Sequence, residues 1–172
     1  MLTVLSNAGP LMALGKLNRL ELLAELYGQV QIPRAVYTET VTQGLNYGAH
    51  DALTIKLFLH YQNWPIIDIS TSLLKNYMPS VALDKGEIEL LALAQTLSEP
   101  LVLLDDEVAR TEARRLNLPV HGTLGVLVQA YQQKLLSFHQ IDLLFQEIAI
   151  RQDIWISGKL CQQILNSLSK SN

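Results

Sequence analysis

Three acidic residues follow a short apolar run in the second half of the chain. Residues 101–104 are apolar, and Asp105, Asp106 and Glu107 come directly after them. The run is typical of a buried parallel strand, and open α/β sheets bind ligands just beyond the carboxyl ends of such strands. Carboxylates gathered there repel one another unless a cation lies among them. Oxygen ligands suit Mg²⁺ or Mn²⁺, so the cluster predicts a divalent metal site.

Other polar side chains occupy equivalent positions along the chain. Asn7 ends the first expected strand, Glu39 lies on the helix after the second strand, and Glu87 lies in the first turn of a later helix. Strand ends and the first turns of the following helices meet at one rim of a parallel sheet. We therefore expect these side chains to converge with the acidic pair. The candidate ligands are Asn7, Glu39, Glu87, Asp105 and Asp106.

Each candidate also has a purely structural interpretation. One of the two adjacent aspartates is expected to cap the following helix, but a cap needs only one acid. Glu39 fits a solvated helical glutamate, and Glu87 fits a first-turn glutamate favoured by the helix dipole. Asp84 is expected to be an N-cap and Glu89 a surface residue. Thr123 either holds a site carboxylate or caps the next helix, and the cap is preferred.

Basic residues follow the acidic pair. Arg110 and Arg114 lie four residues apart, on one face of the expected helix. They are candidates for contacts with RNA phosphates beside a metal. The alternative is that they form ion pairs with Glu107 and Glu112, the usual arrangement at this spacing.

Strands and helices alternate along the chain, which indicates βαβ units around a parallel sheet. We expect a three-layer α/β/α sandwich with four to five central strands, in which residues 2–6 lie beside residues 101–104. The expected strands are 2–6, 30–32, 64–69, 101–104 and 118–120. The expected helices are 11–26 in two segments, 33–44, 50–61, 70–78, 86–97, 108–116, 123–131, 140–151 and 160–168. Pro65 places the third strand at an edge of the sheet.

Composition limits the class of protein. The 172 residues suffice for one domain with a substantial core. A net charge of −3 argues against broad, nonspecific adhesion to nucleic acid. No apolar run approaches a membrane span and no secretion signal is evident. The single cysteine, Cys161, fits a reducing cytoplasm.

The apolar content predicts self-association. Hydrophobic residues make up 49% of the chain and charged residues only 17%, which suggests a buried oligomer surface. Helices at 11–26 and 50–61 carry more apolar side chains than one core face needs, so we expect a homodimer. The alternative is that the two C-terminal helices cover this surplus within one chain.

Four motifs follow one another along the chain: Ser6-Asn7-Ala8-Gly9-Pro10-Leu11, Gly86-Glu87-Ile88-Glu89, Leu103-Leu104-Asp105-Asp106 and Gly122-Thr123-Leu124-Gly125-Val126-Leu127. In this order they resemble the motifs of PIN domains, the metal-dependent ribonuclease fold of many bacterial toxin–antitoxin toxins. Together they resemble a small prokaryotic PIN-related group. The resemblance covers roughly residues 1–135, and with C-terminal helices at about 138–170 it implies a single PIN-like domain.

The resemblance implies three or four acids that bind one or two Mg²⁺ or Mn²⁺ ions and activate water for attack on RNA. The family has an aspartate where this chain has Asn7, and many members have a serine or threonine where it has Gly9. Asparagine can ligate Mg²⁺ but neutralises none of its charge. Two hypotheses follow: a ribonuclease, toxin-like and masked by an antitoxin partner, or a degenerate PIN fold that binds RNA or protein without cutting.

Overall fold

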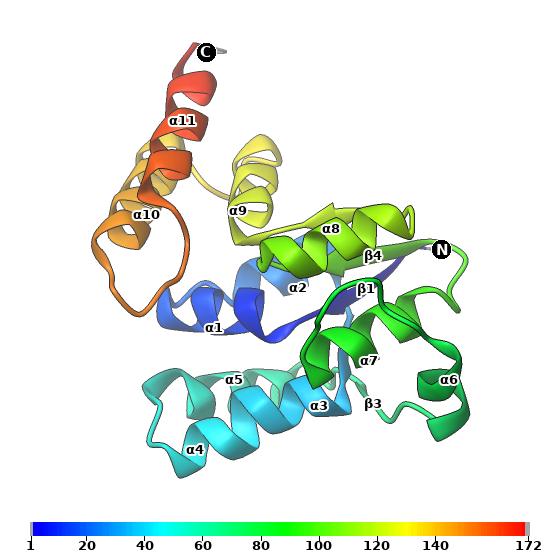
Figure 1. Ribbon diagram of the computed structural model, residues 1–172. Helices are drawn as coiled ribbons and strands as arrows, with labels where there is room; N and C mark the ends of the chain where they lie inside the picture. The colour runs from blue at the N-terminus through cyan, green and yellow to red at the C-terminus, as the bar shows by residue number, and fades with distance from the viewer. Residues whose placement is uncertain (1, 171–172) are drawn as a thin grey trace. The chain divides into compact units, whose positions relative to one another are not determined.

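The computed structural model describes residues 2–170 and shows a five-stranded, fully parallel sheet with helices on both faces (Figure 1). The strands are β1 (Thr3–Ser6), β2 (Val30–Pro33), β3 (Ile66–Ile67), β4 (Pro100–Leu103) and β5 (Val120–His121). Their order is β3-β2-β1-β4-β5, so β1 and β4 lie side by side at the centre. The predicted three-layer α/β/α sandwich and its central strand pair are confirmed.

The helices that flank the sheet fall close to the predicted ranges. They are α1 (Ala8–Lys16), α2 (Glu21–Tyr27), α3 (Arg34–Tyr37), the π-helix η1 (Thr38–Gln43), α4 (Gly44–Asn46), α5 (His50–Tyr61), α6 (Thr71–Asn76), α7 (Lys85–Ala94) and α8 (Glu107–Arg115). The helices α7 and α8 share a hydrophobic core with Leu5 of β1 and Val102 of β4. This packing fixes the first turns of α7 and α8 near the carboxyl ends of the central strands.

The single helix predicted at residues 33–44 is continuous but changes its winding. After one turn as α3 it becomes the π-helix η1, in which the side chains of Thr38 and Thr40 donate to the carbonyls of Arg34 and Val36. Short π segments are often found at functional sites. Glu39, a predicted ligand, lies on this segment.

The edge strand β3 is shorter than predicted, although its edge position is confirmed. Residues 64–69 were expected to be extended, but only Ile66 and Ile67 pair with β2. Trp64 is buried, and its indole nitrogen donates to the carbonyl of Gly28 (3.1 Å). The Trp64 side chain is therefore part of the hydrophobic core at this edge of the sheet.

A second compact unit begins at Leu124. It contains most of α9 (Thr123–Gln132), with α10 (Phe138–Ile150) and α11 (Gly158–Ser169), which pack as a hairpin. Gly158 approaches Ala149 so closely that an added Cβ would lie 3.1 Å from the alanine Cβ. Among residues 2–170, no helix has the length and apolar character needed to cross a membrane.

The loop before α7 is fixed by a buried glutamate. Glu112 is 1% exposed and accepts hydrogen bonds from Ser80, from Tyr77 and, through both of its oxygens, from Arg115. Arg115 and Ser80 together lower the pKa of Glu112 to about 2. Because Ser80 lies shortly before Asp84, this network positions the chain that enters α7.

We expect Glu112→Gln to lower the free energy of unfolding at neutral pH by about 2 kcal/mol, because buried donors lose their charged acceptor. The stabilisation by ionised Glu112 is present above pH 4.5 and is lost as the pH falls towards about 2. The difference between wild type and variant should therefore shrink over that range in urea denaturation curves. Equal stability of the two proteins at pH 7 would contradict this role.

Candidate functional site

Asn7 places an unpaired acceptor at the carboxyl end of the central strands. Its backbone nitrogen donates to the carbonyl of Leu103 (2.9 Å), which continues the pairing of β1 with β4. The residue is 6% exposed, and its Oδ1 atom has no hydrogen-bond partner among residues 2–170. Buried acceptors without partners are rare and need an explanation. A cation bound beside this oxygen would supply one.

Asp84 and Glu87 form a capping box opposite Asn7. The Asp84 nitrogen donates to Glu87 Oε2 (2.9 Å), and the Glu87 nitrogen donates to Asp84 Oδ1 (2.8 Å). A Cβ added to Gly86 would lie 3.2 Å from Asn7 Oδ1 and 3.3 Å from Asp84 Oδ1. Gly86 therefore allows both oxygens to approach the first turn of α7. The predicted cap at Asp84 is confirmed, but the sequence did not identify Asp84 as a site residue.

Glu39 lies on the other side of the first turn of α7. Together with Asp84 and Glu87 it forms an acidic patch. It lines a cavity of about 390 Å³ together with Asp84 and Gly86. Partial burial raises the pKa of Glu39, and the charge of Asp84 raises it further. Burial also raises the pKa of Glu87, and neighbouring carboxylates add to that shift. Those neighbours are Asp84, Asp106 and Glu39. Like charges held this close favour a bound cation.

Asp105 and Asp106 have different roles. Asp106 is exposed, and its Oδ1 accepts from the Ala109 nitrogen (2.9 Å) as the N-cap of α8. Asp105 is held by Thr123, whose nitrogen and hydroxyl donate to its two oxygens at 2.7 and 2.6 Å. Burial raises the pKa of Asp105, against these hydrogen bonds and the charge of Arg110. The prediction that the Thr123 side chain caps a helix was wrong. Its hydroxyl instead orients the carboxylate of Asp105, a candidate metal ligand.

Two glycines make room for the Asp105 carboxylate. A Cβ on Gly9 would lie 3.2 Å from Asp105 Oδ2, and one on Gly122 would lie 2.8 Å from Asp105 Oδ1. The same Gly122 Cβ would also lie 2.7 Å from Arg110 Nη1. Any side chain at position 122 would therefore displace the carboxylate and the guanidinium. Gly9, Asp105 and Gly122 belong to the first, third and fourth of the sequence motifs, so these three motifs meet at the Asp105 carboxylate.

Comparison with known proteins agrees with this arrangement. A family model described as PIN domain matches residues 3–170. The chain belongs to the PIN-domain family. The match includes the helices of the second unit, and the nuclease-type fold of the family accounts for acids at the carboxyl ends of the central strands. No curated protein matches the chain.

One acid of the PIN domain lies away from the others. Glu89 was expected at the surface, but it is 5% exposed, and its Oε2 accepts from the Ala35 nitrogen (2.7 Å) at the start of α3. The residue before α3 is Pro33, which offers no side-chain acceptor. Glu89, which lies on α7, therefore caps the neighbouring helix α3. The spacing of Glu87 and Glu89 along the sequence could not predict this contact between helices.

The predicted phosphate-binding arginines both contact Glu107. Arg114 Nη1 lies 2.7 Å from Glu107 Oε1, and Arg110 Nε lies 3.6 Å from Glu107 Oε2. Arg110 also donates to the carbonyl of Leu104 (3.0 Å). The alternative of ion pairing is therefore correct for Glu107, whereas Glu112 pairs with Arg115 instead. Glu107 is exposed in both pairs, so the pairs contribute little to stability.

The acids do not form a ready-made metal cage. Within residues 2–170, no group of three or more His, Cys, Asp or Glu side chains is arranged to hold a metal ion. The reason is that Asp84, Glu87 and Asp106 are engaged in helix capping, and Asp105 is held by Thr123. Mg²⁺ commonly uses one or two carboxylates together with substrate phosphates. The oxygen donors present are of the kind that a hard divalent ion takes.

We expect Glu87→Gln to stabilise the metal-free protein by about 0.5–1 kcal/mol at pH 7, as is common when a functional charge is removed. Glutamine keeps a carbonyl acceptor for the Asp84 nitrogen but removes a charge repelled by its neighbours. Because the pKa of Glu87 is raised, wild type is penalised as the pH rises through that pKa. The advantage of the variant should therefore vanish in acid.

Thermal melts in EDTA from pH 4 to pH 8 measure this effect. Glu25→Gln, at an exposed position of α2, is the matched control and should leave the melting temperature unchanged. A Glu87→Gln protein less stable than wild type at pH 7 would show that the capping role of the carboxylate outweighs the repulsion.

Proposed function

We propose that this PIN domain is a divalent-metal-dependent ribonuclease. The observation that carries the proposal is the buried, unpartnered Oδ1 of Asn7, which faces Asp84 across Gly86. Glu39 and Glu87, whose pKa values are raised by burial and by the charge of Asp84, lie close to Asp84. A hard cation would relieve both the orphaned acceptor and the repulsion. The proposed ligands are Asn7, Glu39, Glu87, Asp105 and Asp106, with Asp84 added from the structure.

The bound Mg²⁺ or Mn²⁺ would lower the pKa of a water molecule and stabilise charge on the attacked phosphate. The protein supplies the oxygen ligands and their orientation. Thr123 holds Asp105 through both carboxylate oxygens, and the capping box holds Glu87. Arg110 and Arg114 would bind phosphates that flank the attacked group, exchanging Glu107 for the RNA.

The test is cleavage of a mixed RNA pool with Mn²⁺, with and without a chelator. We expect chelator-sensitive cleavage that Glu87→Gln abolishes and that Glu25→Gln preserves. Cleavage that persists in EDTA would contradict metal dependence. Absence of cleavage under all conditions, with RNA binding retained, would favour the second candidate function.

We expect Asn7→Asp to lower the melting temperature without metal and to enlarge the stabilisation by Mn²⁺. The added carboxylate is buried and close to Asp84, so it costs stability until a cation compensates it. A ligand that binds only the native state stabilises by RT ln(1 + [L]/Kd). Melts at increasing Mn²⁺ concentrations therefore measure affinity in each protein.

In wild type this shift should appear only at high Mn²⁺ concentration, and Glu87→Gln should remove it. Mg²⁺ melts serve as the comparison for ion preference. If Mn²⁺ leaves wild type and Asn7→Asp equally unchanged, the acidic patch is not a metal site.

The second candidate is a catalytically inactive PIN fold that binds RNA or protein. The observations that favour it are the neutral side chain at Asn7 and the engagement of the acids in capping. Under this candidate, Asn7→Asp restores metal binding and cleavage that wild type lacks. The two candidates are thus separated by the same pair of proteins.

We further propose a toxin-like role, with an antitoxin protein that masks the site and a cytoplasmic location. Support comes from the resemblance of the motifs to the toxin type of PIN domain and from the single cysteine, Cys161. An antitoxin-sized reading frame directly upstream of the gene is the observation that would support this role.

A homodimer is proposed from an apolar stripe on α5. Leu53, Leu57 and Tyr61 are 52%, 44% and 75% exposed and recur every four residues, on one face of the helix. In contrast, the leucines of α1 and of the α1–α2 turn are buried. We had expected them to add to an exposed apolar surface, and they do not. The stripe on α5 is the part of the predicted surplus that remains exposed.

We expect light scattering at micromolar concentration to give twice the chain mass of 19.2 kDa. Leu53→Glu should shift the protein to monomer, because it places a charge in the buried centre of the interface. Leu143→Glu, at a comparably exposed leucine of α10 (49%), is the control and should leave the dimer intact. A monomeric wild type would overturn the dimer.

A further inference from the structure

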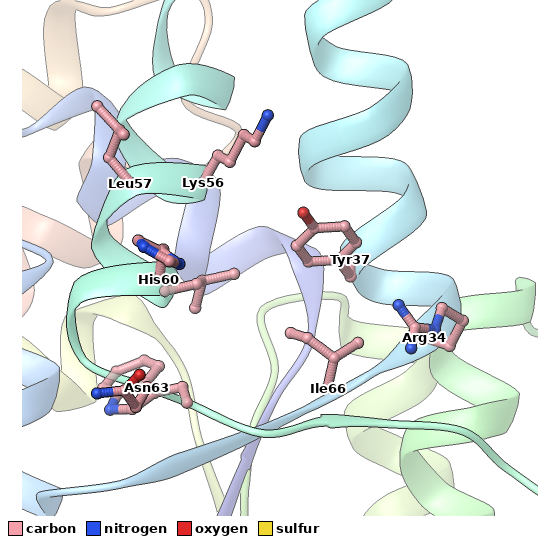
Figure 2. A pocket seen from close by; sticks show the side chains of 9 residues that line it. Arg34, Tyr37, Lys56, Leu57, His60, Asn63 and Ile66 are labelled. Carbon is pink, nitrogen blue, oxygen red and sulfur yellow. The ribbon is translucent and has the colours of Figure 1, made fainter.

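A second cavity lies between α3, α5 and the edge strand β3 (Figure 2). Its volume is about 630 Å³, within the range of ligand pockets. We propose that it binds one nucleotide of a single-stranded RNA, with the phosphate at its basic rim and the base against Tyr37. This inference rests on RNA as the substrate of the proposed nuclease, but it concerns a separate site. Because Leu57 of the α5 stripe also lines this cavity, the inference applies to the protein with that stripe uncovered, and a dimer formed through the stripe would compete with RNA.

The lining of the cavity is basic in composition, unlike the chain as a whole. The whole protein has 16 acidic and 13 basic residues, excluding histidine. The lining nevertheless includes Arg34, Lys56 and His60 and contains no Asp or Glu. Lys56 is exposed and forms no ion pair among residues 2–170. An anion is therefore the ligand that this lining favours.

Two of the basic groups come from one helix face. Lys56 and His60 are four residues apart on α5, and Figure 2 shows both on the side of α5 that borders the cavity. Arg34 lies across the cavity at the start of α3, where Asp68 accepts from its Nε and Nη2 (2.8 and 3.1 Å). This bidentate pair offsets part of the charge of Arg34. Lys56, which forms no ion pair among residues 2–170, is therefore the main cation of the lining.

Aromatic and apolar side chains provide a surface for a base. Tyr37 is half-buried and projects from α3 towards α5, with its hydroxyl on the side of Lys56 (Figure 2). Trp64 and Ile66 also line the cavity. Trp64 is fixed by its hydrogen bond to Gly28 and by an edge contact with Phe58, with ring centroids 5.0 Å apart. Aromatic rings beside basic groups are the usual components of single-strand RNA sites.

The position of the cavity connects it with the acidic patch. Arg34 and Tyr37, three residues apart, line this cavity, whereas Ala35, Thr38 and Glu39 line the acidic one. The two cavities therefore lie on different faces of the same helical segment, α3 and η1. A single strand that crosses this segment can place one phosphate at the acids and a neighbouring nucleotide in the basic cavity. The separation of charge matches those two tasks.

The test is fluorescence anisotropy with a fluorescein-labelled, mixed-sequence RNA of ten nucleotides, measured in EDTA so that neither metal nor cleavage contributes. We expect Lys56→Gln to weaken binding about threefold or more and to reduce the salt slope by about 0.7, the value for one lost phosphate contact. Tyr37→Leu should weaken binding at least about fivefold through lost stacking, whereas Tyr37→Phe should bind like wild type. Lys75→Gln, at an exposed lysine of α6, is the matched control.

Equal affinity of wild type, Lys56→Gln and Tyr37→Leu would overturn the inference. So would binding of a ten-residue oligoglutamate peptide in place of RNA, which would assign the cavity to an acidic protein partner. Melting temperatures check that each variant is folded, and if Tyr37→Leu is not, Lys56→Gln carries the test. Because the assay needs no metal, loss of the Mn²⁺ response would defeat the nuclease proposal and leave this inference standing.

Discussion

The pairing of β1 with β4 is the constraint on which the site depends. These strands are distant in sequence but adjacent at the centre of the sheet, with Ser6 opposite Leu103. Their common carboxyl end therefore places Asn7 near the start of the acidic pair, and Gly9 directly against Asp105. The helices α1 and α8, which follow these two strands, therefore begin at the same end of the sheet. A shift of one of these strands by one residue would turn its side chains to the opposite face of the sheet.

The acids at this rim also maintain the fold. Asp84 and Glu87 cap α7, Asp106 caps α8, and Glu89 caps α3 from the side. Helix capping brings carboxylates to the amino ends of helices, where the dipole favours negative charge. It also brings them close to one another, and this proximity adds to burial, the main cause, in raising the pKa values of Glu39 and Glu87. Capping thus stabilises each helix separately but leaves the carboxylates repelling one another. A divalent ion bound between them would offset this repulsion.

The helical segment α3–η1 separates two chemical environments. One face presents Glu39 beside Asp84, and the other presents Arg34 and Tyr37 opposite the basic face of α5. The π-helical winding of η1 changes the angular position of residues after Tyr37. An RNA strand bound across this segment, as proposed, would meet the acidic oxygens of Glu39 and Asp84 on one face and the basic groups of Arg34 and Lys56 on the other. The proposed division of labour therefore depends on one short stretch of backbone.

The sequence alone determined the order of strands and helices, the edge position of β3 and the cap at Asp84, because hydrophobic periodicity, the missing N–H of Pro65 and capping are local. The pairing of β1 with β4 is not local, and it was expected as part of the three-layer α/β fold. The sequence could not determine what side chains meet across elements. Thr123 orients Asp105 and Glu89 caps α3 because packing brings distant segments together. The basic cavity of Lys56 and Tyr37 has no sequence motif, since its residues come from separate elements. Tertiary structure decided these features, because hydrogen bonding and burial depend on neighbours in space.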